Sequence, residues 1–253
     1  MNADSLHAPP FDATLFAKGP ARDSRFRVVN QWIECDNYDH DDPKRELEFL
    51  HRQMNEEING MENAAQSLAD FPGAEWEIRM QIARQCYDEA RHVIIFQRLF
   101  EERGGRVGQH PVMNFQFRII TNINNLVGRL AVQNRSFEAE GVDAVEPEIE
   151  RCRQRGDEEL ADLFDAQLAD EIGHVRFAND YIAKKTKESP ASVMQIGRAL
   201  DYAGRAFRNV MGEEVIEGVG YGTNSRGRLE AGFTETEVRF AEERRGPKKV
   251  GAI

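Results

Sequence analysis

Two motifs of the form Glu-x-x-His could bind metal ions: Glu89-Ala-Arg-His92 and Glu171-Ile-Gly-His174. Each lies in a long stretch whose apolar residues recur at helical spacing, and residues three apart lie on one face of an α-helix. A carboxylate and an imidazole placed in this way can bind the same ion, and a second motif on a facing helix can bind a neighbouring ion. Carboxylate and imidazole ligands suit first-row metals that take part in oxygen chemistry.

Two further glutamates complete a pattern that occurs twice in the chain. Glu57 precedes Glu89 by 32 residues, and Glu138 precedes Glu171 by 33 residues. In both copies the first glutamate is followed by glycine three positions later, and the second is preceded by glutamine four positions earlier. One glutamate from each of two helices, with a Glu-x-x-His motif from each of two others, builds dimetal sites in four-helix bundles. We therefore predict a duplicated helix pair with six metal ligands: Glu57, Glu89, His92, Glu138, Glu171 and His174.

An aspartate precedes each motif, at Asp88 and Asp170. A metal-bound imidazole usually donates its other N–H to a carboxylate or carbonyl, which sets its tautomer and orientation. We predict that each aspartate reaches the histidine of the opposite motif, so that Asp88 pairs with His174 and Asp170 pairs with His92. The alternative is that both aspartates are solvated. Arg91 is interpreted as a surface ion-pair partner.

Gly60 and Gly141 each lie one helical turn after a lone glutamate. Glycine inside a helix costs about 0.5–1 kcal/mol relative to alanine, so a specific reason for it is expected. One hypothesis is a cavity beside the metals through which dioxygen or a substrate enters; the other is close helix packing. Cys86 and Tyr181 could also face the site, although a structural role is favoured for both.

The elements that must position these residues are long helices, because no stretch alternates with period two long enough to predict a sheet. Residues 1–41 form an irregular arm with apolar anchors, among them Trp32, that packs on the helices. Residues 42–186 are expected to form a four-helix bundle with the dimetal site, and residues 187–253 a helical extension and tail. The four helices are expected at about 43–70, 74–102, 114–142 and 157–185, with a connection over 143–156 that could contain a short helix over 147–153, where Pro147 suits the first helical position. Further helices are expected at 192–211 and 235–243, a glycine-rich loop at 218–227 and a loose tail from 244.

The chain has 253 residues and a formal net charge of −11. It contains no apolar run of the length that a membrane span needs and no secretory signal pattern. Three widely spaced cysteines do not form a disulfide framework, so a cytoplasmic protein is expected. The acidic charge disfavours nucleic acid as a partner, since binding to the phosphate backbone is mainly electrostatic.

With these motifs in place, the chain resembles the ferritin-like di-iron carboxylate superfamily over about residues 44–243, and it is most similar to a poorly characterised bacterial branch. The matching stretches are 57–72, 88–92, 137–143, 156–157, 170–175 and 231–233. Glu140 and Asn59 depart from the arginine and glutamine expected in that branch. The resemblance implies an all-α, four-helix bundle with additional helices and a di-iron centre that performs one of several oxidative reactions.

The function expected is that of a non-haem di-iron oxidoreductase that activates dioxygen or peroxide to oxidise a small organic substrate. The cofactor would be two iron ions, and manganese suits the same ligands. The alternatives are an iron-handling ferroxidase, a peroxide-scavenging protein, a tRNA-modifying hydroxylase and a dimetal site that serves stability alone. The expected partners are dioxygen and the small-molecule substrate. An electron-donor protein and a homodimer are left open.

Overall fold

The computed structural model describes residues 23–39, 42–212 and 222–245, and in this part of the chain the fold is all-α apart from two very short strands. The elements in chain order are β1 Val28–Val29, η2 Trp32–Glu34, α1 Lys44–Asp70, α2 Trp76–Glu102, β2 Val112–Met113, α3 Phe115–Thr121, α4 Leu126–Val132, η3 Gln133–Glu138, α5 Ala139–Gln154, α6 Glu158–Glu188, α7 Pro190–Met211, α9 Ser225–Glu230 and α10 Glu235–Arg245. None of the described helices has the length and apolar character that a membrane span requires.

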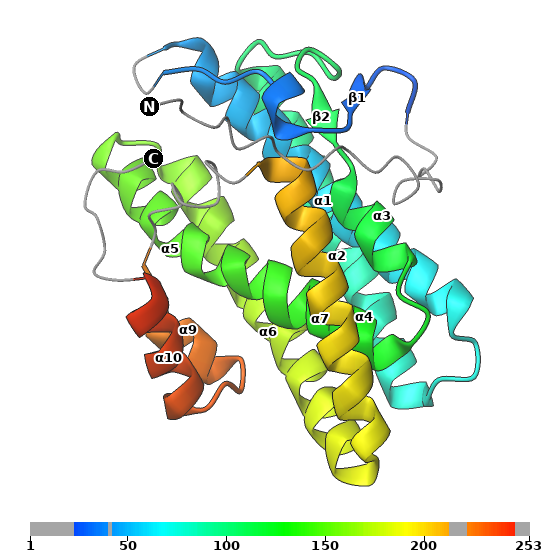
Figure 1. Ribbon diagram of the computed structural model, residues 1–253. Coiled ribbons are helices and arrows are strands. Elements are labelled where there is room, and N and C mark those ends of the chain that lie inside the picture. The colour runs from blue at the N-terminus through cyan, green and yellow to red at the C-terminus, as the bar shows by residue number, and fades with distance from the viewer. Residues whose placement is uncertain (1–22, 40–41, 213–221, 246–253) are drawn as a thin grey trace, which may run out of the picture.

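Two helix pairs position the site (Figure 1). Helices α1 and α2 are joined by five residues and pack along their length, and α5 and α6 are joined by a turn in which Gly156 has φ +75°. Helix α2 packs against α6 and thereby joins the pairs. Their shared core buries large apolar side chains, among them Phe96, Phe100 and Phe164. Burial of such side chains contributes roughly 1.5–3 kcal/mol each, which favours one fixed packing of the four helices.

The helix predicted over 114–142 is interrupted, and that prediction was wrong in its middle. Helix α3 ends at Thr121, and α4 begins at Leu126. The side chain of Asn125 accepts a hydrogen bond from the Gly128 N–H at 2.8 Å, which caps the start of α4. Arg129 donates to the carbonyl of Ile123 at 2.7 Å, so a buried side chain satisfies a backbone group that a continuous helix would have paired.

The connection predicted over 143–156 was wrong over 143–146, where α5 continues without a break, whereas the short helix predicted over 147–153 forms part of α5. Pro147 lies inside this helix, where it lacks the N–H that would bond four residues back. The helix persists because Val145, Ile149 and Cys152 bury their side chains in the core shared with α6. Packing therefore outweighs the local preference for a break.

The remaining boundaries differ by a few residues from those expected, with two exceptions. Strand β1 pairs in parallel with β2, Val28 opposite Val112, although no sheet was expected. Helix α9 begins inside the predicted loop, where the Asn224 side chain accepts from the Gly227 N–H at 2.8 Å. Trp32 packs against the cluster formed by α3 and α7, as expected of an anchor. Residues 1–22, 40–41, 213–221 and 246–253, with most of the predicted arm, part of the loop and most of the tail, lie outside the described residues.

Candidate metal centre

All six predicted ligands come together inside the helices. The metal-binding atoms of the first group lie within 4.8 Å of one another, and so do those of the second. The first group is Glu57, Glu89, His92 and Glu171; the second is Glu89, Glu138, Glu171 and His174. Glu89 and Glu171 belong to both groups, which is the arrangement expected of carboxylates that bridge two ions. The described residues therefore form two adjoining sites that could each hold a metal ion.

Four separate elements supply these side chains. Glu57 comes from α1, the first motif from α2, Glu138 from the end of η3 and the second motif from α6. The π-helical segment η3 was not predicted; it has wider turns than an α-helix, and such segments often occur at functional sites. Glu138 is its last residue, so the local change of helical register contributes to the direction of this carboxylate.

Both histidines direct Nδ1 toward the carboxylates. His92 Nδ1 lies 3.1 Å from Glu57 Oε2 and 3.3 Å from Glu89 Oε2. His174 Nδ1 lies 3.5 Å from Glu171 Oε2 and 3.6 Å from Glu89 Oε1. Nδ1 is thus the ring atom of each histidine that is available to an ion at the centre.

The opposite ring nitrogens contact the two aspartates in the crossed pairing expected from the sequence. His92 Nε2 lies 3.2 Å from Asp170 Oδ2, and His174 Nε2 lies 3.3 Å from Asp88 Oδ2. When each Nε2–H donates to its aspartate, Nδ1 is left with a lone pair directed at the centre. The hydrogen bond from His174, assisted by Arg91, holds the pKa of Asp88 well below its usual range although burial acts in the opposite direction.

Arg91 connects the two aspartates. Its Nη2 donates to Asp88 at 2.7 Å and to Asp170 at 2.9 Å, and its side chain is about 40 % exposed. The interpretation as an ion-pair partner holds, but the partners are the carboxylates behind both histidines. The sequence indicates the contact with Asp88, because Arg91 lies three residues after it, one turn along the same helix.

Two glutamines contact the lone glutamates, a role that the sequence did not predict. Gln167 on α6 donates to Glu57 Oε1 at 2.8 Å, and Gln85 on α2 donates to Glu138. Asn134 adds a second donor to Glu138 at 2.8 Å. In the sequence the two glutamines occupy equivalent positions in the two halves, and this could have indicated their shared role. In the structure each glutamine donates to the lone glutamate of the opposite half.

The hypothesis of a cavity beside both glycines is wrong for Gly60. A Cβ at Gly60 would lie 2.9 Å from the carboxylate carbon of Glu89, so the glycine permits close packing against a predicted ligand. A Cβ at Gly141 would meet no heavy atom within 4 Å among the described residues. The two glycines are equivalent in the sequence but not in their surroundings.

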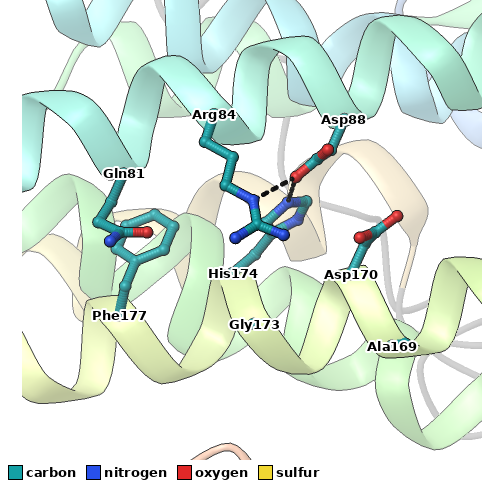
Figure 2. A pocket seen from close by; sticks show the side chains of 8 residues that line it. All are labelled: Gln81, Arg84, Asp88, Ala169, Asp170, Gly173, His174 and Phe177. Atoms are coloured by element: carbon teal, nitrogen blue, oxygen red, sulfur yellow. Dashed lines mark hydrogen bonds and ion pairs between the residues drawn. The ribbon is translucent and has the colours of Figure 1, made fainter.

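A cavity of about 70 Å³ lies between α2 and α6 on the side of the aspartates (Figure 2). Asp88, Asp170 and His174 line it together with Gln81, Arg84, Ala169, Gly173 and Phe177. The cavity therefore reaches the outer side of His174.

Cys86 and Tyr181 pack against an apolar cluster that includes Ile78, Ile82 and Leu130. Burial raises the pKa of the Cys86 thiol, which favours the structural role expected for it.

Without a bound cation, the centre concentrates negative charge in the protein interior. Burial, and then the charge of Glu171, raises the pKa of Glu89 to about 8 and also raises that of Glu138 well above its usual range. Burial opposes protonation of His92, but hydrogen bonds to Glu57 and Glu89 outweigh it and raise its pKa to about 11. These shifts show how strongly the cluster favours added positive charge.

Two atoms at the centre lack hydrogen-bond partners among the described residues, namely Glu171 Oε2 and His174 Nδ1. Both are atoms that could bind a metal ion, they lie 3.5 Å apart, and buried polar atoms normally have partners. Four carboxylates would neutralise two divalent ions, which removes most of the cost of burying them. The residues present therefore fit a pair of metal ions.

Comparison with known proteins places the chain in a family without assigning an activity. A family model described as "Protein of unknown function (DUF455)" matches residues 2–239. An uncharacterized protein of Haemophilus influenzae is 32 % identical over 110 residues, which are 44 % of this chain and 35 % of that protein. The chain thus matches about a third of the length of this relative. No solved structure matches the chain.

Proposed function

The chain belongs to the DUF455 family, whose description states no activity, and on this premise we propose from the site itself that the protein is a non-haem dimetal oxidoreductase. We further propose that the four helices around the site form a ferritin-like bundle, that the ions are iron and that the substrate is a small organic molecule. The resemblance of the motifs to di-iron carboxylate proteins supports these finer assignments.

The observation that carries the proposal is the overlap of the two ligand groups at Glu89 and Glu171. A site that binds one structural ion needs no second histidine on a facing helix and no shared carboxylates. When bound, two redox-active ions in such a ligand set supply one-electron steps to dioxygen or peroxide. In an oxygenase reaction one oxygen atom enters the substrate and the other forms water, with two electrons from a donor protein and two protons.

The residues of the chain have separate tasks in this proposal. Asp88 and Asp170 hold the imidazoles with Nδ1 facing inward, and Arg91 holds the two aspartates in a fixed relation. Gln85 and Gln167 orient the lone glutamates through their amide groups. The buried surroundings exclude water from the centre, which limits unproductive side reactions.

Metal content tests the site. The purified protein should bind about two iron ions per chain, as expected of this ligand set. Glu89→Ala and His174→Ala should each lose most of this iron, whereas Glu77→Ala, an exposed change on the same helix as Glu89, should retain it. A wild-type chain with no affinity for iron or manganese would overturn the proposal.

The reaction of the iron(II) form with dioxygen tests the chemistry. The expected result is a transient visible absorption band followed by oxidation of an added small amine or aromatic compound when a reductant is supplied. Oxidation of iron(II) with release of iron(III), and with no organic product from a broad panel of compounds, would instead indicate an iron-handling protein.

A further inference from the structure

An apolar stripe runs along the outer face of α2, on the opposite side of the helix from the core. Four large side chains in it are exposed in the described structure: Trp76 by 68 %, Met80 by 42 %, Tyr87 by 66 % and Ile94 by 67 %. Ala83 and Ala90, both half-buried, complete the row. The steps between successive members are four, three, four, three and four residues, which is the heptad spacing of a helix-to-helix seam.

We propose that this stripe is the interface of a homodimer, in which α2 of one chain packs antiparallel against α2 of a second copy. The inference is independent of the proposed function, because no predicted metal ligand belongs to the stripe. Over its 19 residues the seam would be roughly 28 Å long at the rise of an α-helix.

The order of side-chain sizes supports an antiparallel pair. A twofold axis between Arg84 and Cys86 places Met80 opposite Ala90 and Tyr87 opposite Ala83 of the second copy, so that large residues meet small ones. Trp76 meets Ile94 at both ends. Interfaces of this kind are close-packed, and alternating large and small residues allow the two helices to approach. A parallel pair would instead set Tyr87 against Tyr87 and Ala83 against Ala83, which leaves crowded and empty layers.

The charges that flank the stripe are also complementary in the antiparallel register. Glu77 of one copy is level with Val93 of the other and so lies between Arg91 and Arg98 on that side of the stripe, and the twofold axis produces this arrangement twice. Near the axis, Arg84 is level with Cys86 of the second copy and lies between its Arg84 and Arg91. Both arginines are already compensated within their own chain, Arg84 by Asp88 at 3.4 Å and Arg91 by Asp88 at 2.7 Å.

The exposed apolar area is adequate for a stable interface. Two copies would bring four large aromatic side chains into the seam; each buries on the order of 150–250 Å² when fully covered, and about two-thirds of each is still exposed in the single chain. When Met80, Ile94 and the aliphatic parts of the flanking charged side chains are added, the area buried by the two copies together is on the order of 1,000 Å², the minimum expected of a specific interface. Gln81 and Arg84, which line the cavity, lie on the adjoining face of α2, so the second copy would border that cavity.

The mass of the full-length protein in solution tests the proposal. Light scattering coupled to gel filtration should give twice the mass of one chain for the wild type. Tyr87→Glu and Ile94→Glu should give the mass of one chain with unchanged helical circular dichroism. Phe240→Glu, at a side chain on α10 that is 60 % exposed, is the matched control and should remain a dimer. A wild-type monomer, or a dimer that survives both seam variants, would overturn the proposal.

Charge reversal and cross-linking test the register without relying on apolar variants. Glu77→Arg should weaken the dimer, because it places a third arginine between Arg91 and Arg98 of the other copy. Met80→Cys combined with Ala90→Cys should form an intermolecular disulfide under mild oxidation, whereas each single variant should not. Cross-linking of Met80→Cys alone would indicate a parallel pair and contradict the antiparallel seam.

Discussion

Glu89 packs directly against Gly60: a Cβ at position 60 would lie 2.9 Å from the carboxylate carbon and 2.9 Å from Oε1 of Glu89. The contact joins α1 to α2 at the carboxylate that belongs to both ligand groups. The lack of a side chain at position 60 is therefore part of the geometry of the centre.

Gly60→Ala should displace Glu89 and reduce iron affinity at least tenfold, because the added methyl group occupies space that the carboxylate needs. Gly141→Ala is the matched control in the other half of the chain. Its Cβ would meet no heavy atom within 4 Å among the described residues, so it should leave iron binding unchanged, with the chain more stable by about 0.5–1 kcal/mol through helix propensity. Iron titration and urea unfolding measure both effects; equal losses of iron in the two variants would contradict this account.

Asp88→Asn and Asp170→Asn should each lower metal affinity by about ten- to a hundredfold, because a neutral amide is a weaker acceptor than a carboxylate and can turn its NH2 group toward the ring nitrogen, which disturbs the tautomer and orientation of the histidine. Asp165→Asn, an exposed change on the same helix as Asp170, is the control and should have no effect. Competition with a chelator measures the affinity. If both aspartate variants bind metal as the wild type does, the aspartates do not orient the histidines.

Stability should fall at acidic pH partly through His51, which is fully buried on α1 and accepts a hydrogen bond from the Gly108 N–H at 2.9 Å. Burial, assisted by the charge of His110, lowers its pKa from 6.5 to about 4. Because the folded-state pKa is below the unfolded one, its contribution is complete above pH 6.5 and is lost as the pH falls toward 4. The loss should reach up to about 3 kcal/mol.

His51→Gln removes this titration and leaves an amide oxygen that can accept the same hydrogen bond. The free energy of unfolding of the variant, measured by urea denaturation in the same metal state as the wild type, should depend less on pH between 6.5 and 4. Curves for the two proteins that run parallel over this range would show that His51 does not titrate as described.

Asp143→Ala should destabilise the chain by about 3–5 kcal/mol, because it leaves the Arg228 guanidinium buried without its partner. In the wild type Arg228 Nη2 donates to Asp143 Oδ2 at 2.6 Å, and the Asn224 N–H donates to the same carboxylate at 2.8 Å. This pair attaches α9 to α5. Arg226→Ala, at an exposed neighbour on α9, should cost far less, because exposed ion pairs contribute little to stability. Urea unfolding compares them, and equal costs would refute a special role for the buried pair.

Local periodicity explains why the ligand set could be predicted from the sequence. The i, i+3 spacing places Glu89 beside His92 on any α-helix, and the matched spacing in the second half indicated which glutamates belong to each motif. The crossed aspartate pairs followed from the same reasoning, since an aspartate one position before a motif glutamate lies at the edge of the ligand face. The interruption after Thr121 and the helix through Pro147 did not follow, because Arg129 and the apolar side of α5 act through contacts with distant segments.

By itself, the sequence determined the helical class of the described chain, the six candidate ligands and the aspartates behind the histidines, because these depend on residue types and spacing within single helices. Only the tertiary structure decided that Gly60 is packed while Gly141 is open, that η3 is π-helical at Glu138 and that each glutamine acts on the opposite half. Those features depend on how closely helices approach one another, and that distance is set by the packing of the whole core rather than by any local pattern.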